Sequence, residues 1–461
     1  MTDPLLKIAV VGHTNTGKTS LLRTLTRNSD FGEVSDGPGT TRHVEGARLK
    51  LDGKPALEWF DTPGMEDSIA LLEYLERLDD PDTRRDGPAR IRRFLDSPEA
   101  HRRYEQEARV LTKMLDCDAA LYVIDARDPV LSKHRDELAI LAACGRPLLP
   151  VLNFVNAPVH RADEWRDAMA RLGLHAALEF DTIAPPLDGE RQLYAKLAVL
   201  LDRHAATLHR LSDALMRQRS ERHQAAWQLV ADLLIDVGAL RVASPADDDA
   251  LQTNMTKLRE QVRRREQACV DALLALYNFH RHDYAEGDLP LTDARWGMDL
   301  FHPQALKDMG IQLGTGMAAG AMAGAAVDIF SAGLSLGTGM LIGATAGGLW
   351  QGVERFGGRL MDKLRGYREI TVDDAVLRLL ALRQRQLINA LERRGHAARD
   401  PVHLDRPADQ AWRSGKLPDV LKESRSRPEW SALNKGHDDS ERRKRVVAEL
   451  ARVLAAQDEA S

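Results

Sequence analysis

The chain has 461 residues, a formal net charge of −5, 43% hydrophobic residues and 29% charged residues. Its length exceeds one ordinary hydrophobic core, so two or three domains are expected. The composition excludes a disordered chain, and the net negative charge argues against a general nucleic-acid binder.

The cysteines and the N-terminal residues indicate the compartment. Cys117, Cys144 and Cys269 are scattered, with no pair at metal-ligand spacing, which fits buried thiols in a reducing cytosol. The first residues, MTDPLLKIAVVG, lack the basic region, the long apolar stretch and the cleavage site of an export signal. A cytoplasmic protein is therefore expected.

The first part of the chain, residues 1–187, alternates apolar strands with helical stretches. Residues 5–11 read as a buried strand that ends at Gly12, and residues 20–27 have helical spacing. Further strands are predicted at 43–51, 56–60, 119–126, 147–155 and 175–180. This alternation predicts an α/β domain with a mostly parallel sheet and helices on both faces.

A phosphate-binding motif follows the first strand. The sequence GHTNTGKT matches the pattern G-x-x-x-x-G-K-[ST] between a strand and a helix. Gly12 and Gly17 would let backbone N–H groups converge on an anion at a helix N-terminus. Lys18 would neutralise the β- and γ-phosphates, and the Thr19 hydroxyl would bind Mg²⁺. The nucleotide-binding residues predicted from the motif are Gly12, Thr16, Gly17, Lys18, Thr19 and Ser20.

Two later segments would complete this site. Thr40 and Thr41 lie in a polar loop after the first helix, and Thr41 is the favoured hydroxyl for completing the Mg²⁺ shell, with a solvated turn as the alternative. The strand in EWFDTPG ends at Asp61, which could hold Mg²⁺ through a water. Gly64 could turn its N–H toward the γ-phosphate, so this loop would sense whether that phosphate is present.

Residues 66–116 are a highly charged stretch that is too long for an ordinary connection. They read as two helices broken at Ser97-Pro98, inserted on the rim of the sheet. Glu66, Asp67 and Glu73 are predicted to form a solvated helix face, with the positioning of water as the alternative role.

The sequences GHTNTGKTS, GTTR and DTPG, in this order and spacing, resemble the Era/TrmE/EngA-like branch of the bacterial small GTPases, over about residues 5–185. The resemblance implies a GTP-binding domain in which Thr41 is the Mg²⁺ ligand of the first switch and Asp61–Gly64 form the second switch. It also implies that Asn15 could bind K⁺ beside the phosphates. Met65 stands where Ras-like GTPases carry a water-orienting Gln, so hydrolysis should be slow without a stimulating partner or cation.

The base-recognition motif departs from this family, in which an Asn/Thr-Lys-x-Asp sequence reads guanine. Asn153 matches the first position, and Phe154 could cover the base by stacking. Asn156 replaces the carboxylate, and Asp181 is an alternative source of it. GTP is the expected nucleotide, with ATP or relaxed base specificity as the alternative.

After residue 187 the strand signals stop, which predicts an all-α C-terminal region. Long amphipathic helices are expected at 192–218, 251–279 and 369–394. The region divides into a helical domain at 188–308, a Gly/Ala-rich segment at 309–353, and a helical and partly disordered tail at 354–461. The tail after His396 is expected to be loosely ordered until a last helix at 440–457.

The Gly/Ala-rich segment contains an internal repeat. GTGMAAGAMAG at 314–324 matches GTGMLIGATAG at 337–347 at eight of eleven positions. Glycines at four-residue spacing would let two helices pack closely, which predicts a hairpin with DIFSAG near its turn. Residues 310–352 carry one charged side chain, Asp328. Conditional membrane insertion and a tightly packed soluble hairpin are equally favoured alternatives.

These observations lead to the hypothesis of a GTPase switch that hydrolyses GTP to GDP and whose nucleotide state exposes or hides the 309–353 hairpin at the inner face of a membrane. The alternatives are a ribosome- or RNA-associated GTPase and a nucleotide-binding scaffold without hydrolysis. The expected cofactors are Mg²⁺ and, from the resemblance, K⁺. Candidate partners are GTP and GDP, the inner-membrane surface or a membrane protein, and a second copy of the chain; nucleic acid is not expected.

Overall fold

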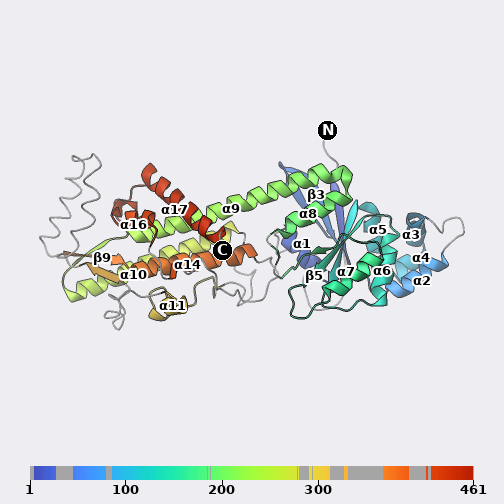
Figure 1. Ribbon diagram of the computed structural model, residues 1–461, viewed down its shortest axis with the longest axis horizontal. Helices are drawn as coiled ribbons and strands as arrows, with labels where there is room; N and C mark the ends of the chain where they lie inside the picture. Colours follow the sequence, from blue (N-terminus) through green and yellow to red (C-terminus); the bar gives the residue numbers. More distant parts are fainter. Residues whose placement is uncertain are drawn as a thin grey trace. The chain divides into compact units, whose positions relative to one another are not determined.

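The computed structural model forms two compact units, each with its own core (Figure 1). The first comprises Met1–Arg219 and Glu392–Asp400, and the second comprises Ser220–Leu391 and Pro401–Ser461. The structure describes residues 5–26, 45–78, 86–277 except 184 and 187, 279, 290–311 except 293, 327–330, 367–393, 412–413 and 417–459.

The first unit is built on a six-stranded sheet with the strand order β2-β3-β1-β4-β5-β6. Its strands are β1 (Leu6–Val11), β2 (Glu45–Leu51), β3 (Lys54–Asp61), β4 (Ala119–Asp125), β5 (Leu148–Asn153) and β6 (Leu178–Glu179). All neighbours pair in parallel except β2, which is antiparallel to β3. The predicted α/β class with a mostly parallel sheet is confirmed.

Helices cover both faces of this sheet (Figure 1). Alternate residues of β1 point to opposite faces. Ile8 packs with α1 (Lys18–Thr26), α8 (Gly189–Leu200) and the start of α9 (Ala205–Ala239), whereas Ala9 packs with α6 (Ser132–Ala142) and α7 (Ala162–Arg171). The first unit therefore continues beyond the boundary predicted at 187, because Leu193 and Leu208 belong to its core.

The charged segment between β3 and β4 differs from its prediction. Its described residues, 62–78 and 86–118, form four helices: α2 (Ser68–Arg77), α3 (Gly87–Leu95), α4 (Pro98–Arg102) and α5 (Glu105–Asp116). The predicted break is present, since Ser97 caps α4 and Pro98 begins it. However, α5 is not on the rim, because its Leu111 and Met114 are fully buried in the same cluster as Val11 of β1.

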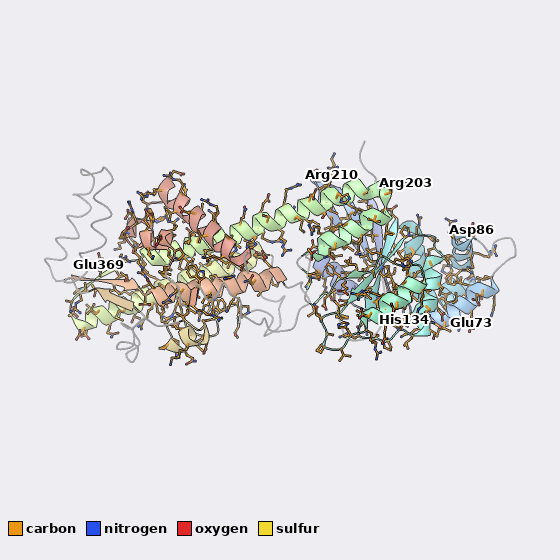
Figure 2. All side chains as sticks on the ribbon, viewed as in Figure 1. Glu73, Asp86, His134, Arg203, Arg210 and Glu369 are labelled. Carbon is orange, nitrogen blue, oxygen red and sulfur yellow. The ribbon has the colours of Figure 1, made fainter. Side chains whose placement is uncertain are left out.

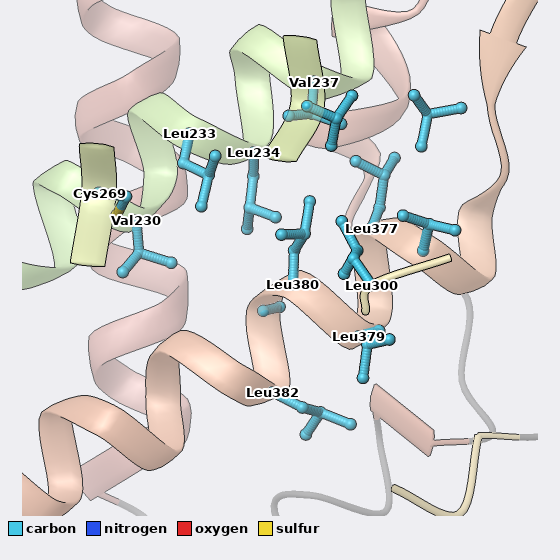
Figure 3. Packing of buried hydrophobic residues seen from close by; sticks show 14 of the residues in the cluster. Val230, Leu233, Leu234, Val237, Cys269, Leu300, Leu377, Leu379, Leu380 and Leu382 are labelled. Carbon is cyan, nitrogen blue, oxygen red and sulfur yellow. The ribbon is translucent and has the colours of Figure 1, made fainter. Parts of the chain in front are cut away.

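The second unit is largely helical, as predicted. Its helices are the C-terminal part of α9, α10 (Asp248–Leu276), α11 (Pro303–Asp308), α14 (Asp374–Arg393), α16 (Asp419–Ser424) and α17 (Glu441–Glu459). Figure 3 shows part of their common core, in which Leu234 of α9 and Leu380 of α14 lie in one apolar cluster. Trp430, in the short 3₁₀ helix Pro428–Trp430, is buried in the same cluster, so the tail is packed well before the last helix.

A three-stranded antiparallel sheet in the second unit was not predicted. Its strand order is β7 (Val242–Pro245), β9 (Tyr367–Val372) and β8 (Val327–Phe330). The helix predicted from residue 369 begins at Asp374 instead, because Ile370 and Val372 alternate with polar residues and are fully buried.

The Gly/Ala-rich segment at 309–353 lies outside the described residues except for 309–311 and 327–330. Residues 327–330, expected near the turn of a helical hairpin, are the strand β8. No helix within the described ranges combines the length and the apolar character needed to span a bilayer.

Candidate functional site

The loop between β1 and α1 has the backbone that the phosphate-binding motif requires. Gly12 and Gly17 have φ angles of 143° and 87°, which favour glycine. A Cβ atom on Gly12 would lie 2.4 Å from the carbonyl oxygen of Val123, and one on Gly17 would lie 2.3 Å from Nδ2 of Asn153. Both glycines are therefore required by close packing against β4 and β5 as well as by their dihedral angles.

Lys18 is held inside this loop. Its Nζ donates hydrogen bonds to the carbonyl oxygens of Gly12 at 3.1 Å and His13 at 2.7 Å. Burial lowers the pKa of Lys18, while the negative charges of Asp61 and Glu137 oppose that shift. The lysine therefore lies at the first turn of α1 with an ammonium group largely shielded from water.

Thr19 and Asp61 come together from α1 and β3. The hydroxyl of Thr19 donates to Oδ2 of Asp61 at 2.5 Å, and Asp61 is 1% exposed. A hydroxyl and a carboxylate are the hard oxygen donors that Mg²⁺ prefers, so these two residues fit the predicted metal position. Next along the chain, the hydroxyl of Thr62 donates to the carbonyl of Val10 at 2.7 Å and fixes the end of β3 beside β1.

The segment after Asp61 contacts the phosphate-binding loop directly. A Cβ atom on Gly64 would lie 2.4 Å from Oγ1 of Thr14, so only glycine allows this approach. His13 and Met65 form a parallel β-bridge, and the Met65 side chain is fully buried. Met65 therefore belongs to the core and has neither the chemistry nor the exposure to orient a water molecule.

Two other helices hold the start of α2. Oε1 of Glu107, on α5, accepts hydrogen bonds from the backbone N–H groups of Glu66 at 3.0 Å and Asp67 at 3.1 Å. The hydroxyl of Ser68 donates to the carbonyl of Lys133, on α6, at 2.9 Å. The side chains of Glu66 and Asp67 are exposed. Glu107 was not singled out in the sequence because it lies within a charged helix.

Asn153, the first residue of the predicted base-recognition motif, makes hydrogen bonds to three segments of the first unit. Its Nδ2 donates to the carbonyl of Thr16 at 3.0 Å. Its Oδ1 accepts from the backbone N–H groups of Phe154 and Thr182, both at 2.9 Å, and from the Thr182 hydroxyl at 3.1 Å. Asn153 is fully buried and joins the phosphate-binding loop to the segments after β5 and β6.

Phe154 lies beside Gly17 and is stacked by Arg127, which follows β4. A Cβ atom on Gly17 would be 3.3 Å from Cζ of Phe154. The Arg127 guanidinium lies 4.0 Å from the centroid of the Phe154 ring. Asp125 holds Arg127 through two hydrogen bonds, Nε to Oδ1 at 2.9 Å and Nη2 to Oδ2 at 2.6 Å. The position of Arg127 just after β4 is the signal in the sequence that could have indicated this role.

The structure describes some of the remaining predicted positions and leaves others outside its described residues. Asp181 accepts backbone hydrogen bonds at 2.9 Å from Asn156 and from Ile183, so its carboxylate supports the loop. Asn15 is exposed and has a φ of 64°. Thr41 and its neighbour Thr40 lie outside the described residues.

The fold and this site define the N-terminal domain as a P-loop GTPase domain, and residues 7–154 match the family described as 50S ribosome-binding GTPase. Residues 166–452, more than half of the chain, match a second family, described as a domain of unknown function (DUF3482). The chain belongs to this second family. No curated protein sequence matches the chain.

Solved structures that match part of the chain include Era in complex with MgGDPNP and nucleotides of 16S ribosomal RNA, the G domain of the T. maritima FeoB iron transporter, and the elongation factor SelB from Methanococcus maripaludis in complex with the GTP analogue GppNHp. Their identities are 16%, 17% and 15%, with TM-scores of 0.28, 0.26 and 0.26. The matches cover 39%, 42% and 43% of this chain and 51%, 98% and 34% of those chains. The chain thus spans about half the length of the Era chain.

Proposed function

We propose that the chain is a GTP-dependent switch that binds GTP with Mg²⁺ and hydrolyses it to GDP. The observation that carries this proposal is the contact between Thr19 and Asp61, 2.5 Å apart, at the first turn of the helix that also carries Lys18. A hydroxyl, a carboxylate and an ammonium group gathered at a glycine-rich loop match the requirements of a magnesium-bound triphosphate.

In this proposal each residue has one task. The backbone N–H groups of the loop and the Lys18 ammonium bind the phosphates, while Thr19 and Asp61 hold Mg²⁺, with Thr41 as the proposed third ligand. Mg²⁺ would supply neutralisation of the charge on the phosphate oxygens. Gly64 would respond to the presence of the γ-phosphate, because it packs against Thr14 of the phosphate-binding loop. A displacement of Gly64 would move the start of α2, which follows it in the chain.

The primary test is a calorimetric titration of the full chain with GTP, ATP and XTP in the presence of Mg²⁺. GTP is expected to bind most tightly. Lys18→Ala should abolish binding of all three nucleotides, whereas Lys50→Ala, a change to an exposed lysine on β2, should leave it unaltered. Unchanged affinity in Lys18→Ala contradicts the phosphate-site assignment.

Hydrolysis is proposed to be slow, since the buried Met65 cannot position water. Phosphate release should be measured at saturating GTP in KCl and in NaCl. Faster release in KCl, lost in Asn15→Ala, would support a K⁺ site at Asn15. Absence of release in both salts, with binding intact, would favour a scaffold that binds without turnover.

The Gly/Ala-rich repeat supports a second element of the proposal, that the nucleotide state controls association of residues 309–353 with the inner face of a membrane. Liposome flotation of the full chain with a GTP analogue and with GDP tests this element. A larger floated fraction in one nucleotide state is expected; equal fractions refute it.

A ribosome-associated GTPase is the second candidate function, because residues 7–154 match a family described by ribosome binding. It predicts that the chain sediments with 50S subunits in the presence of a GTP analogue, and that this association weakens steeply as salt is raised. No co-sedimentation at low salt excludes this candidate.

A further inference from the structure

A cluster of ionisable side chains lies where the phosphate-binding loop meets β4 and α6. Its centre is Glu137, on α6, which is 0% exposed. Oε2 of Glu137 accepts a hydrogen bond from the Tyr122 hydroxyl at 3.3 Å and lies 4.0 Å from Nδ1 of His13. Within the described part of the chain, Oε1 of Glu137 has no hydrogen-bond partner. A buried carboxylate with so few donors is costly to keep charged.

Ionisable groups act on Glu137 from the phosphate-binding loop, β4, α5 and α6. Lys18 of the loop and Lys133 of α6 favour its charged form, whereas Glu107 of α5 disfavours it. Burial outweighs the two lysines and raises the pKa of Glu137 to about 8. In return, the negative charge of Glu137 opposes the effect of burial on the pKa of Lys18.

The two histidines of the cluster titrate at lower pH. Burial and the charge of Lys133 lower the pKa of His13, whose Nε2 is 2.8 Å from Nζ of that lysine. His134, labelled in Figure 2, packs against Trp165, and burial lowers its pKa to about 4. Near pH 8 both histidines are therefore neutral, and Glu137 is the member of the cluster that exchanges a proton.

We propose that Glu137 is a positioning residue of the phosphate site, which near pH 8 and above balances the charge of Lys18 in the nucleotide-free protein and takes up a proton from solvent when the triphosphate binds. The inference rests on the proposed nucleotide binding. In the free protein, Asp61 and Glu137 are the anions that act on the buried ammonium group. A bound triphosphate supplies that counter-charge and adds negative potential, so Glu137 loses its stabilising partner and becomes a neutral carboxylic acid.

The sign of the pH dependence follows from this exchange. The complex carries more protons than the free protein, so lowering the pH favours binding. Nucleotide affinity should therefore fall as the pH rises through the pKa of Glu137, by about threefold to tenfold per pH unit above pH 8. In Glu137→Gln, the hydrogen bonds of Lys18 to the carbonyl oxygens of Gly12 and His13 should persist.

Calorimetry of the full chain with the β,γ-imido analogue of GTP and Mg²⁺ at pH 8 tests the proposal, because this analogue releases no protons by hydrolysis. Titrations in HEPES and in Tris, which differ in ionisation enthalpy, give the number of protons taken up. The wild-type chain should take up a substantial fraction of one proton. Glu137→Gln should take up none, with an affinity within tenfold of wild type.

Two controls separate Glu137 from its neighbours. His13→Asn and Asp136→Asn, the second on the same helix as Glu137, should both retain proton uptake. Wild-type binding without buffer dependence, or the same uptake in Glu137→Gln, overturns the inference alone. If the wild-type chain binds no nucleotide, the proposed function fails with it. The pH dependence of wild-type affinity between 7.5 and 8.5 requires no variant, and a flat profile also overturns the inference.

Discussion

The side-chain amide of Asn153 donates a hydrogen bond to the carbonyl oxygen of Thr16, 3.0 Å away, and so ties the end of β5 to the phosphate-binding loop. The same side chain accepts the backbone N–H of Thr182 from the segment after β6. Three separate segments thus depend on one buried amide. The conformation of the phosphate-binding loop therefore depends on Asn153, a residue of the predicted base-recognition motif.

Asn153→Ala should weaken the binding of every nucleotide alike. The change leaves the Thr182 N–H and the Thr16 carbonyl without their buried partner, which costs about 1–3 kcal/mol. We expect roughly tenfold or greater loss of affinity for GTP and for ATP, with their ratio unchanged. Asn156→Ala is the matched comparison, since a base-reading residue should alter that ratio. A shift of base preference in Asn153→Ala would show that Asn153 reads the base.

Glu107→Ala should release the start of α2. Two backbone N–H groups, those of Glu66 and Asp67, lose their buried acceptor. Hydrogen–deuterium exchange across residues 66–77 should become faster, because the free energy of opening this segment falls by about 1–3 kcal/mol. Glu105→Ala removes an exposed carboxylate from the same helix and should leave exchange in that segment unchanged. Equal exchange in both variants would mean that Glu107 does not hold this segment.

Asp61→Asn should remove the effect of Mg²⁺ on GTP affinity. The amide keeps the shape of the carboxylate but loses the charge that attracts the cation. Affinity in Mg²⁺ should drop by about tenfold or more, while affinity in EDTA should stay close to that of wild type. Asp52→Asn, at an exposed turn between β2 and β3, is the control and should preserve the Mg²⁺ effect. Retention of the full effect in Asp61→Asn would place the metal elsewhere.

These residues show what local sequence could and could not predict. Gly12, Gly17 and Gly64 were identifiable because a loop between a strand and a helix, and a loop after the neighbouring strand, impose close backbone approaches at known positions. The mostly parallel sheet with helices on both faces followed from alternating strands and helices. By contrast, Glu107 and Glu137 lie on helices rich in charge, where periodicity alone does not separate a buried carboxylate from a solvated one.

The second unit was harder to predict because its strands are short and their partners are distant in sequence. β7 and β9 pair Val242 with Ile370, across more than a hundred residues, and no local pattern indicates that contact. A short strand leading into a long helix is easily read as the first turn of that helix. The hydrogen bond from Asn153 to the phosphate-binding loop was also not predicted, because a motif specifies residue types and leaves their hydrogen-bond partners open.

A buried ion-pair network joins α17 to α9. Nη2 of Arg443, on α17, contacts Asp232 at 2.6 Å and Asp236 at 2.9 Å, and Asp236 is 1% exposed. Arg443→Met should destabilise the second unit by about 3 kcal/mol, because it leaves buried carboxylate charge less compensated. Arg445→Met, a change to an exposed arginine two residues further along α17, should have little effect on thermal unfolding. Equal unfolding temperatures for the two variants would contradict a stabilising role for the network.

The raised pKa of Glu137 also has a consequence for stability that is independent of nucleotide. Its pKa is about 8 in the folded protein, against an ordinary value of 4.5 in the unfolded chain. Between these values Glu137 is protonated in the folded state and ionised in the unfolded state, so the free energy of unfolding falls as the pH rises from 4.5 to 8. Above pH 8 Glu137 is ionised in both states, and the fold then bears the full cost of a buried charged carboxylate.

Glu137→Gln removes this penalty, since the amide keeps the shape of the acid without its charge. The variant should match wild type near pH 5 and be more stable by the order of a few kcal/mol at pH 8.5. Thermal unfolding of the nucleotide-free chain across this range measures the difference, and Asp136→Asn should follow the wild-type profile. A constant difference at all pH values would mean that the substitution acts through packing and that Glu137 remains charged in the fold, compensated by Lys18 and Lys133.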